Sequence, residues 1–456
     1  MFNSKNSLIV VVAATLIVAA NGACAASPEE AAKLKSDLTP LGAERAGNAD
    51  GSIPRWTGGY TTVPPGYKSG SVRPDFFAED KPILSITKSN MEKYADKLSE
   101  GDRVMLAKFA SYRIDVYPTH RTASAPQWVY DNTFANATRA KTINDGMTLQ
   151  GAYGGIPFPI PRTGNELIWN HELAWAAEAA TFGFSNYMVT DRGESILSSR
   201  AKNVQQYPYY YKDGTLQTFT GDAYMVDNIT TDPPFKAGEV VMYRDPTDYA
   251  ANSRQAWQYL TGQRRVRRAP TIGFDTPNIE ASGVSNYDEI FVFNGSPDRY
   301  DWKIVGKQEL YVPYNDNKLL ASDHAAVFKN GPANMNPDLL RWELHRVWAV
   351  DGTLKAGKRH VIPHRRFYLD EDTWSILLGD GWDAKGQLWK HYYGLPLLAP
   401  DVPGLITVTH VITNVQAGNW AIAVLYNNAS EAHFRSIARE PDSYYTPDAL
   451  AARGVR

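Results

Sequence analysis

The chain is almost without cysteine, because Cys24 is the only one among 456 residues. One thiol cannot form a disulfide within the chain. Once residues 1–25 are removed on export, as argued below, the mature protein has no thiol nucleophile and no thiolate ligand for a metal. Side-chain packing must therefore hold the fold together, and a chain of this length is ample for a large core.

The chain also lacks an excess of charge of either sign and, beyond its start, a long hydrophobic run. Lys and Arg number 47 and Asp and Glu 49, which gives a formal net charge of -2. This balance is too near neutral for a general binder of nucleic acid or of an anionic membrane. No segment after residue 25 is long and apolar enough to cross a bilayer. We therefore expect neither a nucleic-acid partner nor a membrane-spanning segment.

The first 25 residues have the pattern of a secretory signal peptide. Lys5 gives a positive start, Leu8 to Ala20 form a short apolar core, and small residues surround Ala25, so we predict cleavage after that residue. Cys24 allows an alternative, a lipid-modified lipoprotein, although residues 21–23 lack the aliphatic side chain that usually begins such a signal. The prediction is an exported protein of the periplasm.

Composition divides the rest of the chain into segments. Residues 26–86 are rich in Gly, Pro and Asn turns and predict an extended N-terminal arm. Residues 87–440 form the predicted main domain, with helices mainly in 87–182 and strands mainly in 183–430, and residues 441–456 form a C-terminal tail. This order of elements predicts an α+β fold.

Helical patterns lie in the first half of the chain. Apolar residues at helical spacing predict helices over about 87–109 and 126–141. Thr163 and Glu166 have the spacing of a capping box. They predict a third helix that starts there and ends before Gly183.

The stretch Arg341–Tyr393 predicts an antiparallel meander. Runs of aromatic and β-branched residues are separated by turn signals, Asp351-Gly352 and Asp383–Gly386, whose glycines permit a positive φ. Within residues 364–370, the aromatic residues Phe367 and Tyr368 are neighbours. Successive residues of a strand point to opposite faces, so we expect both faces of this sheet to be covered.

Several separated motifs resemble one bacterial family. They are WQYLTGQRRVRRAP at 257–270, YDWKIVG at 300–306, YVPYN at 311–315, FPIP at 158–161 together with WNH at 169–171, and TPDAL at 446–450. Through these motifs the chain is similar to exported bacterial proteins that carry the domain DUF1329. The resemblance spans most of the chain, but it brings no catalytic residue with it.

Residues 365–390 resemble, in their order of strands and turns, the outer-membrane lipoprotein-sorting carriers of the LolA and LolB type. That resemblance implies a LolA/LolB-like α+β fold, in which a large curved antiparallel sheet, an open half-barrel, partly encloses helices. It also implies a carrier for a lipid or other hydrophobic molecule. The family resemblance implies partners, namely an inner-membrane efflux-type transporter and an outer-membrane protein.

Aromatic residues are abundant, with 12 Trp, 26 Tyr and 16 Phe. Most of them are expected to fill a core. A curved sheet that does not close over its interior also leaves an aromatic-lined groove, which suits an apolar ligand with a polar head. The groove candidates all fall on predicted strands and are Trp257, Tyr259, Phe291, Phe293, Trp302, Trp348, Tyr368, Trp374 and Trp389.

Four arginines form the densest cluster of charge, Arg264, Arg265, Arg267 and Arg268. On a predicted strand they alternate between the two faces. Two interpretations stay open. The cluster is either a solvated edge that blocks strand addition by other chains, or a rim that meets an anionic headgroup or an acidic patch of a partner.

Catalytic interpretations find little support in the sequence. His171-Glu172 begins like a zinc-protease helix, but Trp175 stands where the second histidine would be. Residues 370–372, Asp-Glu-Asp, offer paired carboxylates for sugar chemistry, yet a charged hairpin tip is the commoner meaning. We predict no catalytic residue, no metal site and no cofactor.

The sequence therefore predicts a periplasmic carrier or accessory factor, not an enzyme, that binds a lipid or other hydrophobic molecule and works with an envelope transporter. Burial of an acyl chain, at about 0.8 kcal/mol per methylene, needs no catalytic group. Two alternatives stay open. One is an envelope protein that docks a transporter and carries nothing, and the other is a protein that binds or cleaves polysaccharide through exposed Trp and Tyr.

Overall fold

The computed structural model describes residues 25–270, 272–278, 281–329, 332–427 and 433–454. The predicted signal peptide, apart from Ala25, lies outside these residues, and so does Cys24. Within them, no helix has both the length and the apolar character that crossing a membrane requires.

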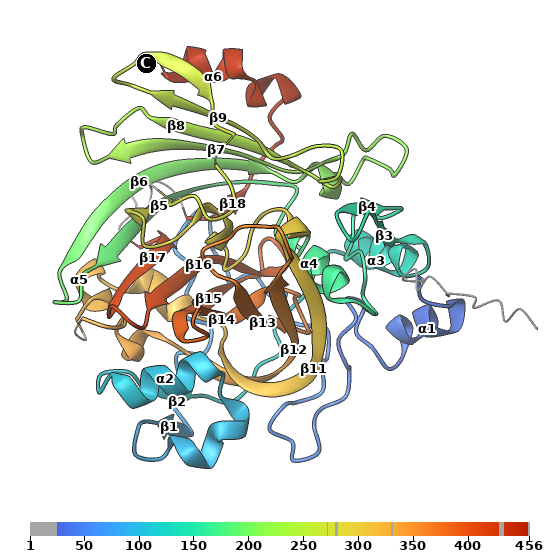
Figure 1. Ribbon diagram of the computed structural model, residues 1–456. Coiled ribbons are helices and arrows are strands. Elements are labelled where there is room, and N and C mark those ends of the chain that lie inside the picture. Colours follow the sequence, from blue (N-terminus) through green and yellow to red (C-terminus); the bar gives the residue numbers. More distant parts are fainter. Residues whose placement is uncertain (1–24, 271, 279–280, 330–331, 428–432, 455–456) are drawn as a thin grey trace, which may run out of the picture.

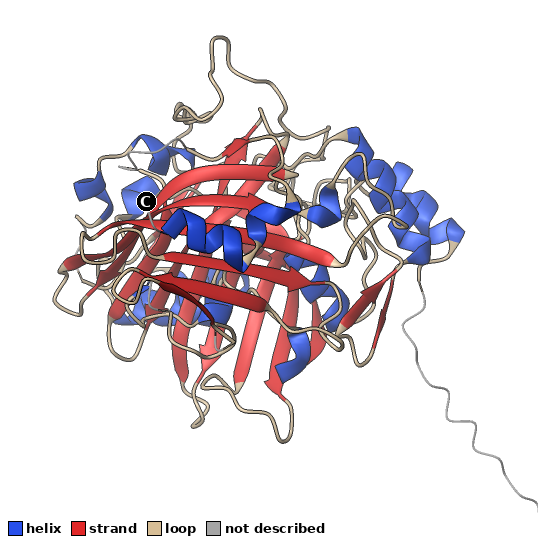
Figure 2. Cartoon of the chain, turned by 90° about the horizontal axis from the view of Figure 1, so that it is seen from above, coloured by secondary structure: helices blue, strands red, loops and turns tan. Residues whose placement is uncertain are grey.

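One large sheet organises the described residues, and it does not close on itself (Figures 1 and 2). It has 16 strands, and every pairing is antiparallel except the contact of β2 with β12. Figure 1 shows the long strands β6 and β11 curving around the body. The main path runs β1 (Leu84–Ile86), β2 (Ile114–Val116), β12 (Trp342–Leu354), β13 (His364–Asp370), β14 (Ile376–Trp382), β15 (Leu388–Ala399), β16 (Gly404–Asn414), β17 (Asn419–Leu425), β5 (Ala179–Val189), β6 (Ser195–Gln206), β7 (Asp222–Asp232), β8 (Val240–Pro246), β9 (Gln255–Leu260) and β10 (Arg265–Arg268).

Two further strands complete the sheet, because β11 (Tyr300–Pro313) pairs with β12 and β18 (Arg435–Ser436) pairs with β5. A separate two-stranded ribbon joins β3 (Lys141–Ile143) and β4 (Thr148–Gln150). The predicted α+β fold with a large, open, antiparallel sheet is confirmed.

Among the described residues, the α-helices α1 to α4 come from the first half of the chain, and Figure 2 shows helices at the flanks of the strands. The α-helices are α1 (Pro28–Ala32), α2 (Glu100–Lys108), α3 (Gln127–Arg139), α4 (Gly164–Glu172), α5 (His324–Val327) and α6 (Pro447–Gly454).

The start of α4 confirms the predicted capping box, because the Thr163 side chain accepts a hydrogen bond from the backbone N–H of Glu166. The prediction that this helix continues almost to Gly183 is wrong. It ends at Glu172, and β5 begins at Ala179. β5 pairs with both β6 and β17, so tertiary pairing overrides the helical preference of the alanines in between.

The two faces of the meander β12–β15 carry different helices. Tyr368 of β13 belongs to the same buried cluster as Met105 of α2. Its neighbours Phe367 and Leu369 belong to a second cluster with Ile168 of α4. Successive residues of a strand point to opposite faces. Helix α2 therefore covers one face and α4 the other, and the expectation that both faces are covered is confirmed.

Asp351 and Gly352 do not form the predicted turn, because both lie inside β12. A Cβ atom at Gly352 would lie 2.4 Å from the ring of Trp302 on the paired strand β11, so the glycine makes room for an indole. Asp351 instead accepts two hydrogen bonds from Arg366, at 2.6 and 2.8 Å. The second predicted corner, Asp383–Gly386, does join β14 to β15 and is confirmed.

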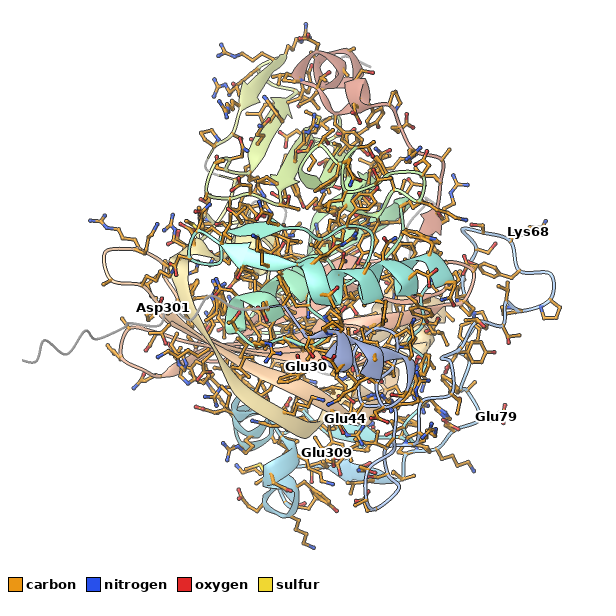
Figure 3. All side chains as sticks on the ribbon, turned by 90° about the vertical axis from the view of Figure 1, so that its right-hand side faces the viewer. Glu30, Glu44, Lys68, Glu79, Asp301 and Glu309 are labelled. Carbon is orange, nitrogen blue, oxygen red and sulfur yellow. The ribbon has the colours of Figure 1, made fainter. Side chains whose placement is uncertain are left out.

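The N-terminal arm lies on the surface of the molecule (Figure 3). It contains no helix or strand between the 3-10 turn after α1 and the start of β1. Glu44 is fixed to β11, where the Lys307 ammonium lies 2.9 Å from its carboxylate. Arg73 donates two hydrogen bonds of 2.8 Å to Asp401, which follows β15. The loop that carries Lys68 extends away from the body in Figure 3.

Candidate functional site

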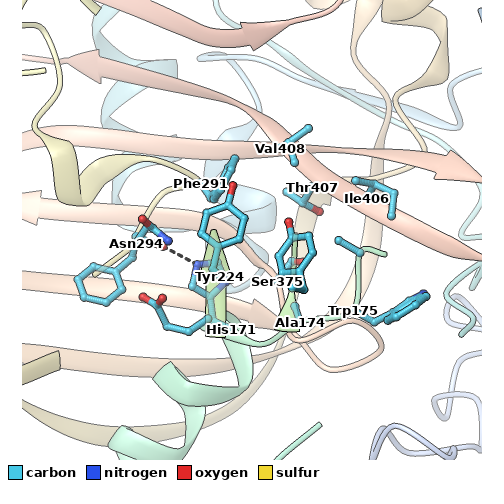
Figure 4. Close-up of a pocket in the computed structure, with 14 residues that line it drawn as sticks. His171, Ala174, Trp175, Tyr224, Phe291, Asn294, Ser375, Ile406, Thr407 and Val408 are labelled. Carbon is cyan, nitrogen blue, oxygen red and sulfur yellow. Dashed lines mark hydrogen bonds between the residues drawn. The ribbon is translucent and has the colours of Figure 1, made fainter. Parts of the chain in front are cut away.

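A pocket lies where the C-terminal end of α4 meets three strands of the sheet (Figure 4). Its volume is about 60 Å³. His171 comes from α4, Tyr224 from β7, Ser375 from the position just before β14, and Ile406 to Val408 from β16. Phe291 adds part of the wall from the segment before β11. We call this the α4 pocket.

A second cavity of about 40 Å³ adjoins the α4 pocket, since Tyr224 and Phe291 line both. Its other walls are apolar, aromatic or amide side chains from β5, β6, β7, β8 and β17 and from the loop residues Asn278 and Ile290, together with His410 of β16. Burial lowers the pKa of His410 to about 4, so this histidine is neutral at neutral pH. Among the described residues, no Lys, Arg or Asp lines either cavity.

His171 uses both ring nitrogens to bind backbone groups. Its Nδ1 accepts a hydrogen bond of 3.1 Å from the N–H of Ile376, and its Nε2 lies 2.8 Å from the carbonyl oxygen of Phe293, to which it donates. Burial lowers the pKa of His171 to about 4, so the ring is neutral. Neither nitrogen is left to bind a metal or to move a proton. His171 instead ties α4 to β14 and to the segment that carries Phe291.

Glu172 supplies the acid of the α4 pocket. Its Oε1 accepts a hydrogen bond of 2.9 Å from the N–H of Gly295, and burial raises its pKa to about 8, with a smaller contribution from the Asp245 carboxylate. The nearby Arg254 does not neutralise it, because its guanidinium donates to Asp245 at 2.6 and 2.7 Å. At neutral pH Glu172 is therefore a carboxylic acid with one O–H to donate.

The segment that carries Phe291 was predicted to be a strand, and that prediction is wrong. Phe291 and Val292 have φ values of +55° and +72°, in the left-handed region that bulky residues rarely adopt. Phe293 anchors the segment, with its ring centroid 5.4 Å from that of Trp302 and its carbonyl bound by His171. Such backbone strain costs about 1–3 kcal/mol per residue and is commonly found at ligand sites.

The nine predicted groove aromatics do not meet at one site. Phe291 and Phe293 line the α4 pocket. Trp302 and Trp374 are buried in the cluster that includes α4, and Trp348 packs against that cluster. Trp302, Trp374 and Trp348 therefore lie in or beside the buried core on the α4 face of the sheet.

The remaining four candidates lie elsewhere. Tyr368 is buried in the cluster on the α2 face of the sheet. Trp257 and Tyr259 of β9 belong to a small cluster with Leu450 of α6. Trp389 lies half-buried on β15, under the Lys390 ammonium at 5.1 Å. Their role in ligand binding stays a prediction.

The four arginines lie on the last hairpin of the sheet, where β9 pairs with β10. Arg265, Arg267 and Arg268 are exposed on β10. Arg264 is exposed too, but it lies in the turn before the strand, with φ at +49°, rather than on the strand as predicted. Their role also stays a prediction.

The carboxylates at 370–372 occupy a hairpin tip, but a buried one, with the three residues at most 2% exposed. Arg121 donates to both oxygens of Asp372, at 2.7 and 2.8 Å. The Lys307 ammonium lies 3.0 Å from Glu371. Asp370 accepts hydrogen bonds from the Tyr314 hydroxyl at 3.1 Å and from Thr373. These contacts explain the acidic run as an internal ion-pair network.

One group within the described residues has the side chains of a metal site. His345, Asp370 and Asp372 each offer a ligand atom, and these atoms lie within 4.8 Å of one another. However, both oxygens of Asp372 already bind Arg121, and the Nε2 of His345 lies 3.1 Å from Glu343. The Arg121 guanidinium supplies the positive charge that an ion would otherwise bring.

Sequence reasoning missed most of the α4 pocket. Tyr207, Tyr224, Ser375 and the run Ile406 to Val408 come from segments far apart in the chain, and only the fold brings them together. One signal was present, because Trp169-Asn-His171 is part of a motif that the family resemblance includes.

Comparisons with known proteins agree with the motifs. Residues 85–451 match the family model described as a protein of unknown function (DUF1329). The chain belongs to the DUF1329 family. This DUF1329 protein is 37% identical over 453 residues to an uncharacterized protein of Pseudomonas aeruginosa, and the match covers 95% of each chain. The family resemblance drawn from the sequence is thereby confirmed.

Two solved structures are similar to this DUF1329 protein at low sequence identity. A DUF1329 family protein from Desulfovibrio piger matches with a TM-score of 0.42 and 16% identity, over 63% of this chain and 97% of that chain. A putative outer membrane lipoprotein-sorting protein domain from Vibrio parahaemolyticus matches with a TM-score of 0.42 and 13% identity, over the same shares of 63% and 97%.

Proposed function

We propose that this DUF1329 protein is a periplasmic carrier or accessory factor, not an enzyme, that holds a lipid or other hydrophobic molecule in the α4 pocket. The observation that carries the proposal is the lining of the pocket, where most side chains are aromatic or aliphatic and Glu172 supplies the one carboxyl group, beside the uncharged polar side chains of His171, Asn294, Ser375 and Thr407. The predicted signal peptide supports a periplasmic location.

The uncharged lining of the two cavities favours an uncharged ligand. Transfer of apolar surface from water contributes about 25 cal/mol per Å². A charged ligand would lose its hydration here without meeting a counter-ion, since none of the described residues that line the two cavities is Lys, Arg or Asp. The O–H of Glu172 can donate to an ester or ketone oxygen. The ligand class is therefore an apolar molecule whose polar end is an uncharged hydrogen-bond acceptor.

Phe291 controls how much of the ligand can enter. The two cavities, of about 60 and 40 Å³, hold only a few water-sized volumes of about 30 Å³ each. A ligand larger than that must displace part of the wall, and the ring of Phe291 is a wall that the two cavities share. Rotation of this half-buried ring joins them into one longer site. The strained backbone at Phe291 fits a residue that changes conformation on binding.

The hydrogen bonds of His171 favour binding over catalysis. A hydrolase needs a base or a metal-held water beside the reacting bond. Both nitrogens of His171 bind backbone groups, and Glu172 is protonated at neutral pH. The pocket thus offers contacts that hold a molecule but no group in position to attack it.

The test is native mass spectrometry of the protein purified from the periplasm without detergent, followed by organic extraction. We expect a stoichiometric hydrophobic adduct on the natural protein and on Phe134→Trp, a matched control on α3. Phe291→Trp should lose the adduct, because the larger ring keeps the cavities apart. Apo protein in repeated preparations, or an adduct retained by Phe291→Trp, would contradict the proposal.

The proposed partners are an inner-membrane efflux-type transporter and an outer-membrane protein. Crosslinking in intact cells, with a photoreactive residue placed on the exposed hairpins of the sheet, tests this part separately. Recovery of the protein without an envelope transporter would remove the partners from the proposal and leave the carrier role to the ligand experiment.

A further inference from the structure

Two hairpin tips lie side by side at one end of the sheet. β7 pairs with β8 up to Ile229 and Val240, and β8 pairs with β9 from Val240 and Tyr259. This register places the β7–β8 turn and the β9–β10 turn at the same end of their strands. Contact confirms it, because a Cβ atom at Gly238 would lie 3.1 Å from the Thr261 side chain. We call residues 233–239 and 261–268 the paired tips.

The first tip presents an exposed aromatic ring. Phe235 is 78% exposed, the highest value among the large apolar side chains of the described residues that are exposed. Pro233 and Pro234 precede it and stiffen the turn. The Lys236 ammonium lies 5.9 Å from the ring centroid and donates to the Ser198 carbonyl oxygen at 3.1 Å. A single exposed apolar side chain is common on a protein surface, so the ring of Phe235 bears on binding only together with the charge of the second tip.

The second tip presents positive charge with no acid to balance it. Arg264, Arg265, Arg267 and Arg268 are all exposed, and the segment 255–270 contains no Asp or Glu. None of these arginines takes part in an ion pair within the described residues.

The acids of the first tip do not cancel this charge. Asp232, at the end of β7, pairs with Arg200 at 3.2 Å. Glu239 is the one acid within residues 233–239, and Lys236 offsets it. The paired tips therefore carry a local excess of positive charge, although the whole chain has a net charge of only -2.

We propose that the paired tips dock the protein on an anionic membrane surface, with the ring of Phe235 at the level of the lipid headgroups and the four arginines against their phosphates. Aromatic rings flanked by cations are typical of residues that lie at a membrane interface. Each basic residue near an anionic surface is expected to raise binding about five-fold.

A membrane fits the paired tips better than an acidic protein does. An acidic partner would use the arginines but would leave a projecting phenyl ring without a matching pocket. The strand β10 also ends the sheet, and arginines on such an edge oppose the addition of a strand from another chain. The tips are thus built to meet a broad charged surface rather than to extend the sheet. The paired tips share no residue with the lining of the α4 pocket.

The experiment is sedimentation of the purified full-length protein with vesicles of phosphatidylcholine alone or with 30% phosphatidylglycerol, a composition chosen for the assay. The natural protein should bind the anionic vesicles at least tenfold more tightly than the neutral ones. Changing the four arginines to glutamine should abolish that difference. Phe235→Ser should weaken binding to anionic vesicles about tenfold, because the ring no longer leaves water.

Matched controls change the same amount of charge and apolar surface elsewhere. Glutamine at the exposed Lys88, Lys93, Lys318 and Lys329 removes four positive charges, and Ile83→Ser removes an apolar side chain that is 69% exposed. Both controls should bind like the natural protein. Equal binding to neutral and anionic vesicles would overturn the proposal. So would a Phe235→Ser variant with unchanged binding, which would leave an acidic macromolecule as the better partner for the arginines.

Discussion

Replacing His391 with glutamine is expected to lower the free energy of unfolding by about 3–5 kcal/mol at pH 7. His391 of β15 lies between two carboxylates, with Nδ1 at 3.0 Å from Asp380 and Nε2 at 3.2 Å from Asp102 of α2. The three side chains are 0% exposed. The imidazolium therefore joins α2 to the sheet, and glutamine would leave two buried carboxylates without a cation.

The pH dependence of this contribution has a definite sign. The two carboxylates outweigh the effect of burial and raise the pKa of His391 from 6.5 to about 10. Because the folded state binds this proton more tightly, the contribution is complete below pH 6.5 and is lost as the pH rises through about 10. The loss amounts to roughly 1.4 kcal/mol per pH unit at most within that window.

Urea unfolding followed by tryptophan fluorescence, between pH 6 and 10, measures both quantities. The stability difference between the natural protein and His391→Gln should be largest near pH 6 and should shrink toward pH 10. His364→Gln is the control, because His364 is 36% exposed and 3.7 Å from Asp351, and it should cost less than about 1 kcal/mol. A cost below about 1 kcal/mol for His391→Gln, or a difference that does not change with pH, would refute this account of the buried imidazolium.

Three further predictions use the same unfolding assay. Gly352→Ala should lower the free energy of unfolding by about 1–3 kcal/mol, because the new methyl group meets the ring of Trp302. Its control, Gly262→Ala, has open space around the new methyl group and should lower the free energy of unfolding by less than about 0.5 kcal/mol. Glu172→Gln should stabilise the protein above pH 5 by an amount that grows to about 4–5 kcal/mol near pH 8 and then stays constant, since the raised pKa of Glu172 makes the natural protein lose stability over that range; an unchanged pH profile would contradict it. Thr163→Ala should cost about 1 kcal/mol, because α4 loses its N-terminal cap, and an unchanged urea midpoint would argue against that role.

Local signals predicted the parts of the fold that depend on local chemistry. The capping box at Thr163 placed the start of α4, and Asp383–Gly386 placed a hairpin turn, because cap and turn residues act on their own backbone. Asp351-Gly352 failed for the opposite reason. Gly352 leaves room for the ring of Trp302 on another strand, and no local pattern predicts that contact.

The α4 pocket was beyond sequence reasoning because its residues meet only through the pairing of distant strands. Aromatic composition indicated a groove, but most of the nine candidates fill cores on both faces of the sheet. Phe291 was expected on a strand, whereas its positive φ takes its segment out of the sheet and into the pocket wall. The protonated state of Glu172 depends on how completely the folded chain surrounds it.

The order of strands also sets when the sheet can form as the chain is synthesised. β5 ends at Val189, but its partner β17 begins only at Asn419. In the same way, β2 ends at Val116 and its partner β12 begins at Trp342. Until more than two hundred further residues exist, both early strands have an open edge that another chain can join. Contacts of such long sequence separation form slowly. We therefore expect the yield of folded protein to fall when a chaperone that shields such edges is depleted.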